Sequence, residues 1–221
     1  MKNYILIATL LSLCLSPAVA VVGVDVSSLV STSSWECLKQ SGFEFSIVRA
    51  WLSFGAMESY AVQNINNAKA GGIQYVDVYM FPCGGKSASN QVNDMISGLS
   101  GADYGMVWID IEVNPSSGCS WASYSYSSNC EYIQSLIKAV KGLGKSVGVY
   151  TSEYEWESVV GSRTACPEAA DGGVQLWYAH YDNNPSFSDF RQIGGWTSPN
   201  IKQYAGDATA CGEGIDKNYY P

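Results

Sequence analysis

Strand patterns and helix patterns alternate along most of this chain, and this alternation narrows the possible folds more than any other feature. Each of the first five strand patterns is followed by a helical one. Those five strand patterns cover residues 21–26, 45–50, 75–80, 106–112 and 146–151. Three more follow without helices between them, at residues 174–179, 200–205 and 214–218. Such units imply a mainly parallel sheet covered by helices, and eight strands can close into a barrel. We therefore expect a single α/β domain over residues 21–221, built as a modified TIM-like barrel.

Capping signals indicate where the helices begin. Ser33 and Glu36 have the S-x-x-E spacing of a capping box, and Ser152 and Glu155 repeat it. Gly144 closes the clearest amphipathic pattern. The expected helices cover residues 33–40, 60–70, 91–99, 131–143 and 152–160.

Residues 1–20 have the pattern of a secretory signal peptide. Lys2 supplies a positive start, residues 4–15 form an apolar core too short to cross a bilayer, and residues 18–20 (AVA) form a small-residue cleavage signal. No later stretch approaches the ~20 apolar residues of a transmembrane helix. We therefore expect a secreted, extracellular protein that has no membrane partner.

Six cysteines remain after the signal peptide, an even number that suits disulfides in an oxidising compartment. They are Cys37, Cys83, Cys119, Cys130, Cys166 and Cys211. Only Cys119 and Cys130 are close enough in the sequence to suggest a particular pair. A zinc site would call for C-x-x-C or histidine-rich spacing, and the chain has neither, with one His in all. We expect three disulfides, no metal and no cofactor.

The charge of the chain limits its partners. The formal net charge is −8 at pH 7, and neither a basic patch nor a basic tail is present. Nucleic acid and anionic membrane surfaces are therefore not expected as partners. The same charge would repel anionic cell-wall polymers at neutral pH. An acidic lumen, such as a gut or a lysosome-like compartment, would suit such a partner better.

The stretch 107–112 (VWIDIE) carries the most informative pair of side chains. Its β-branched residues alternate with Trp108, Asp110 and Glu112, which is the period of a strand with one apolar face. The two carboxylates therefore share a face, with Cα atoms about 6 to 7 Å apart. Unpaired carboxylates are costly to bury, so the pair is catalytic, binds a metal or belongs to an ion pair.

Other acids are expected at the same end of the barrel. Asp25 ends the first strand, and Asp216 lies in the last strand, which closes against the first. With Asp110 and Glu112, four acids converge on the rim where β/α barrels carry their chemistry. Arg49 is the one obvious cation on the barrel side, and we expect it to neutralise one of them. The excess of acids favours catalysis over a structural ion network.

Several blocks of sequence, taken together, resemble glycoside hydrolase family 25. They are Gly23-Val24-Asp25-Val26-Ser27, Trp108-Ile109-Asp110-Ile111-Glu112, Val149-Tyr150-Thr151, Leu176-Trp177-Tyr178-Ala179, Gln203-Tyr204 and Gly214-Ile215-Asp216-Lys217-Asn218. Residues 76–83 (VDVYMFPC) and the extra cysteines resemble the protist-type lysozymes of that family, which nematodes also have. The blocks span nearly the whole of residues 21–221 in the family's order.

This resemblance implies a (β/α)5β3 barrel that cleaves the β-1,4 bond between N-acetylmuramic acid and N-acetylglucosamine in bacterial peptidoglycan. By the same resemblance Glu112 is the general acid and Asp110 its partner carboxylate. Asp110 could be a nucleophile, or it could orient the 2-acetamido group of the sugar for a substrate-assisted reaction with retention, which we favour. Asp25 and Asp216 would complete the catalytic set by tuning these two acids and holding substrate or water.

Aromatic side chains are the candidate substrate contacts. Trp177 and Tyr181 could stack on sugar faces, and Tyr79 and Tyr150 could line the pocket as hydroxyl donors; core packing explains each of them equally well. The lone histidine, His180, faces away from Trp177 and is expected to be non-catalytic. Asp77 is expected to have a structural role or to help bind substrate. The tryptophans at 35, 121 and 156 are expected to be packing residues.

Three functions fit these features. The first is a monomeric secreted muramidase for antibacterial defence or for digesting bacteria. The second is a glycan-binding immune factor that does not cut its ligand, although such a protein would have no use for the proton donor Glu112. The third is a hydrolase of another N-acetylglucosamine polymer, such as chitin.

Overall fold

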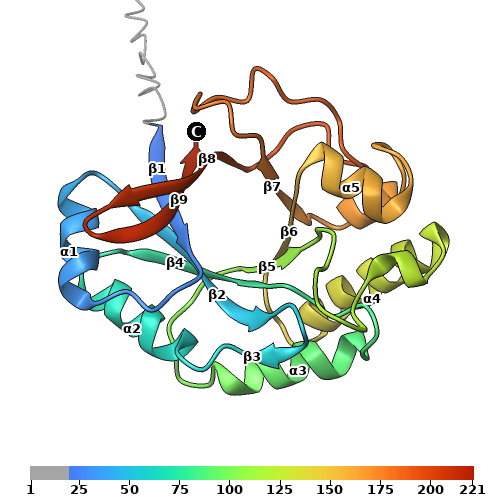
Figure 1. The fold of residues 1–221 in the computed structure, drawn as a ribbon, viewed down its shortest axis with the longest axis horizontal. Coiled ribbons are helices and arrows are strands. Elements are labelled where there is room, and N and C mark those ends of the chain that lie inside the picture. The colour runs from blue at the N-terminus through green and yellow to red at the C-terminus, as the bar shows by residue number, and fades with distance from the viewer. Residues whose placement is uncertain (1–19) are drawn as a thin grey trace, which may run out of the picture.

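A computed structural model describes residues 20–221 and shows a closed barrel of eight strands with helices around it (Figure 1). The barrel strands are β1 (Val21–Val26), β2 (Phe45–Leu52), β4 (Tyr75–Met80), β5 (Val107–Asp110), β6 (Val147–Thr151), β7 (Gln175–Ala179), β8 (Ile201–Ala210) and β9 (Glu213–Tyr220). The expected modified TIM-like barrel is thus confirmed. The expected signal peptide lies outside the described residues, except for its last residue, Ala20.

Strand order explains how the barrel closes. The strands from β1 through β2, β4, β5, β6 and β7 to β8 are parallel to their neighbours, whereas β9 runs antiparallel to both β8 and β1. The short β3 (Ala56–Met57) pairs with the end of β2 outside the barrel. Because β9 closes against β1, Asp25 and Asp216 become direct cross-strand partners.

Within residues 20–221, five α-helices lie outside the ring of strands. They are α1 (Thr32–Gln40), α2 (Ala61–Ala70), α3 (Ala88–Gly98), α4 (Tyr126–Gly142) and α5 (Glu153–Val160), with two short 3-10 turns, η1 (Trp121–Ser123) and η2 (Pro167–Ala170). Ser152 caps α5 as expected. The expected cap of α1 at Ser33 is wrong, because Ser31 has the extended backbone of an N-cap and its hydroxyl accepts the Ser34 N–H, at 3.1 Å.

Two hydrophobic cores follow from the alternation of side chains along the strands. Ile109 of β5 packs outward in the core between barrel and helices, where Trp35, Trp121 and Trp156 are also buried, as expected of packing residues. Trp108 packs inward with Trp177, their ring centroids 5.8 Å apart. The inner core fills the barrel interior below the rim that carries the acids.

The described part of the chain has three disulfides, as expected, but they do not include Cys119 with Cys130. The pairs are Cys37–Cys211, Cys83–Cys119 and Cys130–Cys166. The predicted pair is wrong because its two cysteines, although close in sequence, face different parts of the fold. The loop that follows β5, with Cys119, folds back on the end of β4, whereas the start of α4, with Cys130, faces the loop after α5. No helix within residues 20–221 is long and apolar enough to span a membrane.

Candidate active site

Four acids lie together at the carboxyl-terminal end of the barrel strands. They line one small pocket of about 140 Å³, together with all four aromatic residues proposed from the sequence and one glutamine. Its lining residues are Asp25, Tyr79, Asp110, Glu112, Tyr150, Trp177, Tyr181, Gln203 and Asp216. The structure therefore brings every predicted site residue to one place.

Asp25 is buried and accepts two hydrogen bonds. Its Oδ1 receives the side-chain amides of Gln203, at 2.8 Å, and Asn218, at 2.7 Å. Burial, followed by the charge of Asp216, raises the pKa of Asp25 to about 7. Because Asn218 in turn accepts the indole N–H of Trp177 at 2.8 Å, the barrel core orients this acid.

Asp110 ends β5 with its side chain at the bottom of the pocket. It is only 4% exposed, and its Oδ1 is buried without a hydrogen-bond partner among residues 20–221. Burial, followed by the neighbouring Glu112, raises the pKa of Asp110 well above its usual range. A buried carboxylate oxygen without a partner is costly, so this atom is placed to receive a donor from a ligand.

Glu112 lies just beyond the end of β5, on a peptide unit that is held from both sides. The indole N–H of Trp121 donates to the Glu112 carbonyl at 2.8 Å, and the next N–H, of Val113, donates to Glu155 Oε2 at 2.6 Å. Burial, followed by the charge of Glu155, raises the pKa of Glu112 to about 7. The sequence analysis identified Glu155 only as part of a capping box.

Gln203 connects the acids to the tyrosines. Its amide nitrogen donates to Asp25 at 2.8 Å and to Asp216 at 3.3 Å, while its oxygen accepts the hydroxyls of Tyr150, at 2.6 Å, and Tyr181, at 2.8 Å. Both tyrosine protons are thus used within the protein. We expected Tyr150 to offer a hydroxyl donor to the substrate. Because its proton is donated to Gln203, the hydroxyl oxygen remains as an acceptor. Sequence reasoning did not single out Gln203, although it lies in one of the blocks quoted above.

Asp216, Trp177 and Tyr181 complete the pocket. Asp216 also accepts the Asp207 N–H, at 2.8 Å, and burial raises its pKa. Trp177 is 2% exposed, so it packs in the barrel and is not available for stacking on a sugar face. Tyr181 is 56% exposed, and it lies over Gly206, where a Cβ would come within 2.9 Å of its ring.

The expected role of Arg49 is wrong. It pairs with Glu58, the guanidinium nitrogens lying 2.9 and 3.1 Å from Oε2, because the chain after β3 turns back against β2 and buries that glutamate. Within residues 20–221 no salt bridge reaches any of the four acids of the pocket. Their charges therefore act on one another, which favours proton retention.

Asp77 has a structural position, as expected. Its carboxylate accepts the Met106 N–H at 2.8 Å and the indole N–H of Trp108 at 2.9 Å. It faces a separate, largely apolar cavity that also includes Val21 and Tyr220, away from the four acids.

Two clefts adjoin the acid pocket. The larger, of about 560 Å³, shares Glu112, Tyr150 and Tyr181 with it. The smaller, of about 380 Å³, shares Asp25, Tyr79 and Asp216 with it and is lined in part by residues of the β8–β9 hairpin. The acids thus line the spaces on both sides of the pocket.

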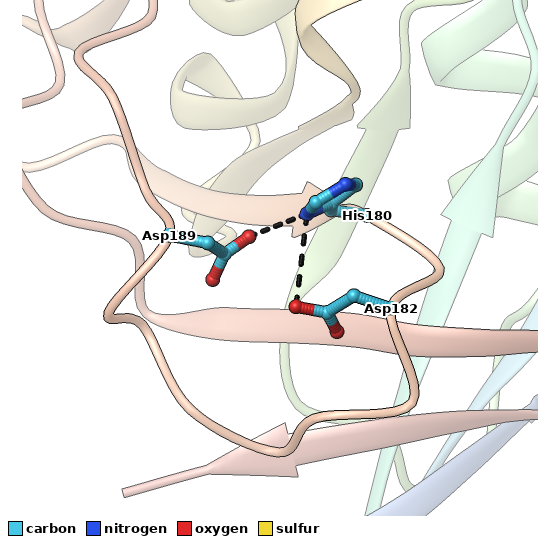
Figure 2. Close-up of side chains that lie close together, drawn as sticks. All are labelled: His180, Asp182 and Asp189. Carbon is cyan, nitrogen blue, oxygen red and sulfur yellow. Dashed lines mark hydrogen bonds and ion pairs between the residues drawn. The ribbon is translucent and has the colours of Figure 1, made fainter.

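His180, Asp182 and Asp189 gather beside the larger cleft (Figure 2). His180 Nδ1 lies 2.6 Å from Asp189 Oδ2 and 3.8 Å from Asp182 Oδ2. The fully buried ammonium of Lys202 donates to both aspartates, at 2.8 and 2.7 Å. Because Lys202 contacts one oxygen of each aspartate, the cluster is an ion network that ties the loop after β7 to β8.

Comparison with known proteins gives consistent matches over nearly the whole chain. The family model described as Lysozyme-like protein 1 matches residues 16–204. Probable GH family 25 lysozyme 2 of Dictyostelium discoideum is 43% identical over 205 residues, covering 91% of this chain and 92% of the relative. Lysozyme-like protein 5 of Caenorhabditis elegans is 34% identical over 227 residues, covering 100% of both.

A solved structure agrees on the fold. The family GH25 lysozyme from Aspergillus fumigatus matches with a TM-score of 0.71 and 20% identity, covering 91% of this chain and 94% of that one.

Proposed function

This chain belongs to the lysozymes of glycoside hydrolase family 25, and on that premise we propose that it hydrolyses the β-1,4 bond between N-acetylmuramic acid and N-acetylglucosamine in bacterial peptidoglycan. It is a glycoside hydrolase with a glycan substrate. The observation that carries the finer proposal is the acid pocket: among residues 20–221, its four carboxyl groups have no cationic partner and one of them has an unpartnered buried oxygen.

Glu112 is the general acid in this proposal. A group that protonates a leaving oxygen must keep its proton at the working pH, and a pKa raised to about 7, by burial and then by Glu155, provides for that in neutral and acidic solution. Glu112 lines both the acid pocket and the larger cleft. The leaving sugar would therefore lie in the larger cleft and the sugar that is attacked in the acid pocket.

Asp110 orients the substrate's own nucleophile. Its unpartnered Oδ1 is placed to accept the N–H of the 2-acetamido group, whose carbonyl oxygen then attacks C1 as the glycosidic C1–O bond breaks. The leaving oxygen takes the proton of Glu112. The Glu112 carboxylate next removes a proton from water, which adds to C1 and releases the acetamido oxygen. Two displacements at C1 give retention of configuration.

Asp25 and Asp216 support this pair from the opposite strands. Burial keeps both of their pKa values raised, and the charge of Asp216 also raises the pKa of Glu112. Gln203 joins them to Tyr150 and Tyr181, so the pocket walls are held by hydrogen bonds before substrate arrives.

We propose further that the mature protein, residues 21–221, is secreted and works as a monomer in antibacterial defence or in digesting bacteria. The three disulfides support an oxidising compartment.

Product analysis tests this proposal. Purified protein is incubated with peptidoglycan and, separately, with chitin oligomers, and the new reducing ends are reduced with borohydride and identified. The proposal predicts muramic-acid-derived ends from peptidoglycan and little cleavage of chitin. Glucosamine-derived ends would point to a different bond, preferred cleavage of chitin to a chitinase, and binding without new ends to a glycan-binding protein.

A further inference from the structure

One peptide unit carries the proposed general acid, and two side chains from separate elements hold it. The C=O of Glu112 and the N–H of Val113 belong to the same planar peptide. Trp121 of η1 donates to that carbonyl at 2.8 Å, and Glu155 of α5 accepts from that N–H at 2.6 Å. With both polar groups fixed, the peptide plane has a set orientation, and so does the direction in which the Glu112 side chain leaves the backbone.

Glu155 departs from the usual geometry of a capping box. Its own N–H donates to the Ser152 hydroxyl at 3.1 Å, which is the ordinary half of the motif. Its carboxylate, however, reaches Val113 in the loop after β5. A group that commonly closes a helix end is used here to join α5 to the loop that carries Glu112.

Glu155 also brings a negative charge without a cationic neighbour. The adjacent Glu153 is neutralised by Arg191, whose guanidinium contacts both carboxylate oxygens, at 2.5 and 2.7 Å. Glu155 forms no salt bridge with any of the described residues, 20–221. Glu155 lines the same cleft as Glu112.

The other titratable groups that line the acid pocket with Glu112 are Asp110 on β5, Asp25 on β1, Asp216 on β9, Tyr79 on β4, Tyr150 on β6 and Tyr181 in the loop after β7. Three of these six are acids and none is a cation. The larger cleft adds Glu153, Tyr154, Glu157, Tyr178, His180, Asp189 and Arg191; there His180 lies against Asp189 and Arg191 against Glu153. After burial, Glu155 has a larger effect on the pKa of Glu112 than any of them.

We propose that Glu155 is a positioning residue for the hydrolysis: it fixes the Glu112–Val113 peptide and, by its charge, keeps the proton on Glu112, so that it sets the alkaline limit of activity. This inference rests on the proposed function. It assigns to α5 a role beyond covering the barrel.

Substitutions can separate the two effects of Glu155. Glu155→Gln keeps an oxygen for the Val113 N–H and removes the charge. The alkaline limb of the kcat/KM profile should therefore move to lower pH by about one pH unit. At pH 5, kcat should stay within about twofold of the wild type. Trp121→Phe removes the opposite hydrogen bond without changing a charge; it should lower kcat about tenfold at every pH and leave the limb in place.

The measurement is the pH profile of kcat and KM on soluble peptidoglycan fragments, from pH 4 to 9. Carbon-13 NMR titration of the Glu112 carboxyl carbon, in the presence and absence of the substitution, measures the same shift without turnover. Glu131→Gln, an exposed glutamate on α4, is the matched control for loss of one negative charge, and its profile should coincide with the wild type.

The outcomes separate this inference from the proposed function. A Glu155→Gln profile that coincides with the wild type, or a Trp121→Phe profile that shifts as far as Glu155→Gln, overturns the role of the Glu155 charge. If wild type has no hydrolytic activity at any pH, the proposed function fails. In that case the NMR titration still decides whether the Glu155 charge holds the Glu112 proton.

Discussion

Lys202 offers the sharpest test of how the cleft wall is held. Its side chain is fully buried on β8, and its ammonium binds Asp182 and Asp189 of the loop after β7. In Lys202→Met the stem of the side chain is kept and the charge is lost. The two aspartates would then face each other and the core without the ammonium group, so we expect a folded but less stable protein.

The size of the loss follows from burial. Removing one partner of a buried ion pair costs about 3 to 5 kcal/mol. Asp182 and Asp189 keep 23% and 20% of their side-chain surface exposed, so water can partly replace Lys202. We therefore expect the lower end, about 3 kcal/mol. For a domain of this size that corresponds to a decrease in Tm of about 6 to 12 °C.

The pH dependence of the effect has a definite sign. Burial alone would raise the pKa of Asp189, but the hydrogen bonds from Lys202 and His180 outweigh it and hold the value at about 2. A carboxylate with a lowered pKa in the folded state contributes stability above its unfolded value of about 3.9, and this contribution is lost as the pH falls through 2. The difference between wild type and Lys202→Met should thus be full at pH 5 to 7 and shrink towards pH 2.

Urea denaturation followed by circular dichroism, at pH 7, 4 and 2.5, measures this difference. The matched control is Lys69→Met: Lys69 forms an ion pair of the same length, 2.8 Å, with Asp103, which is 85% exposed. That change should cost no more than about 1 kcal/mol. Equal losses for the two variants, or a Lys202→Met difference that grows as the solution is acidified, would refute the reasoning.

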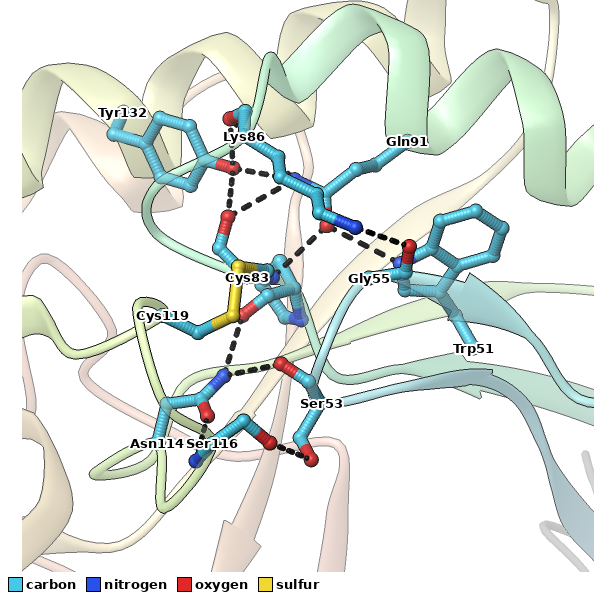
Figure 3. The surroundings of a disulfide bond; sticks show 11 residues. Trp51, Ser53, Gly55, Cys83, Lys86, Gln91, Asn114, Ser116, Cys119 and Tyr132 are labelled. Carbon is cyan, nitrogen blue, oxygen red and sulfur yellow. Dashed lines mark hydrogen bonds between the residues drawn. A yellow bond between two sulfur atoms is a disulfide. The ribbon is translucent and has the colours of Figure 1, made fainter.

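Three further outcomes follow from the site. Because burial above all raises the pKa of Glu112 to about 7, kcat/KM should fall about tenfold per pH unit above pH 7, and activity that rises towards pH 9 would contradict this role. Burial likewise raises the pKa of Asp25 to about 7, so the contribution of this group to stability is full below pH 4 and is lost as the pH rises through 7. The unfolding free energy of the wild type should therefore decline between pH 5 and 8, and Asp25→Asn should make that decline smaller by about 1 to 3 kcal/mol. Equal declines in the two proteins would contradict the raised pKa. Replacing Cys83 and Cys119 by serine should cost about 3 to 4 kcal/mol, and so should opening the disulfide that joins α4 to the loop after α5, since both span 36 residues. Only the loss of the Cys83–Cys119 disulfide should also lower kcat, because that disulfide anchors the loop after Glu112 (Figure 3). Equal values of kcat in the two variants would contradict this.

Local patterns predicted the parts of the fold that depend on neighbouring residues. The alternation through residues 107–112 correctly placed Trp108 inside the barrel and Ile109 outside it. Strand order then brought Asp25, Asp110 and Glu112 to one rim, because parallel strands end at the same edge of a barrel. Asp216 joins them from the antiparallel β9, as the cross-strand partner of Asp25. The two last strands are longer than predicted, because residues beyond Ala205 extend β8 only by pairing with β9.

Features that depend on distant contacts were missed or wrongly assigned. Arg49 pairs with Glu58 and not with a pocket acid, because the return of the chain through β3 could not be read from the strand pattern. The burial of Lys202 under two aspartates has no local signal either. Glu155 had a clear signal, the capping box, but its carboxylate is used across the fold, which the motif does not encode.

The loop after β5 illustrates how many such contacts one functional residue requires. Asn114 donates to the carbonyls of Ser53, at 2.8 Å, and Pro82, at 3.0 Å, and it accepts the Ser116 N–H, at 2.8 Å (Figure 3). Those partners lie on three different connections of the barrel. Together with the disulfide they hold the segment that begins at Glu112, although none of them was identifiable from spacing.

The most direct test of the central claim is the rate at which purified protein clears a suspension of Gram-positive cell walls at pH 5, for wild type and Glu112→Gln. The glutamine variant keeps the shape of the side chain and cannot supply a proton, so its rate should fall at least about a hundredfold while its thermal unfolding stays cooperative. A folded Glu112→Gln that clears walls as fast as the wild type would contradict the assignment of Glu112 as the general acid.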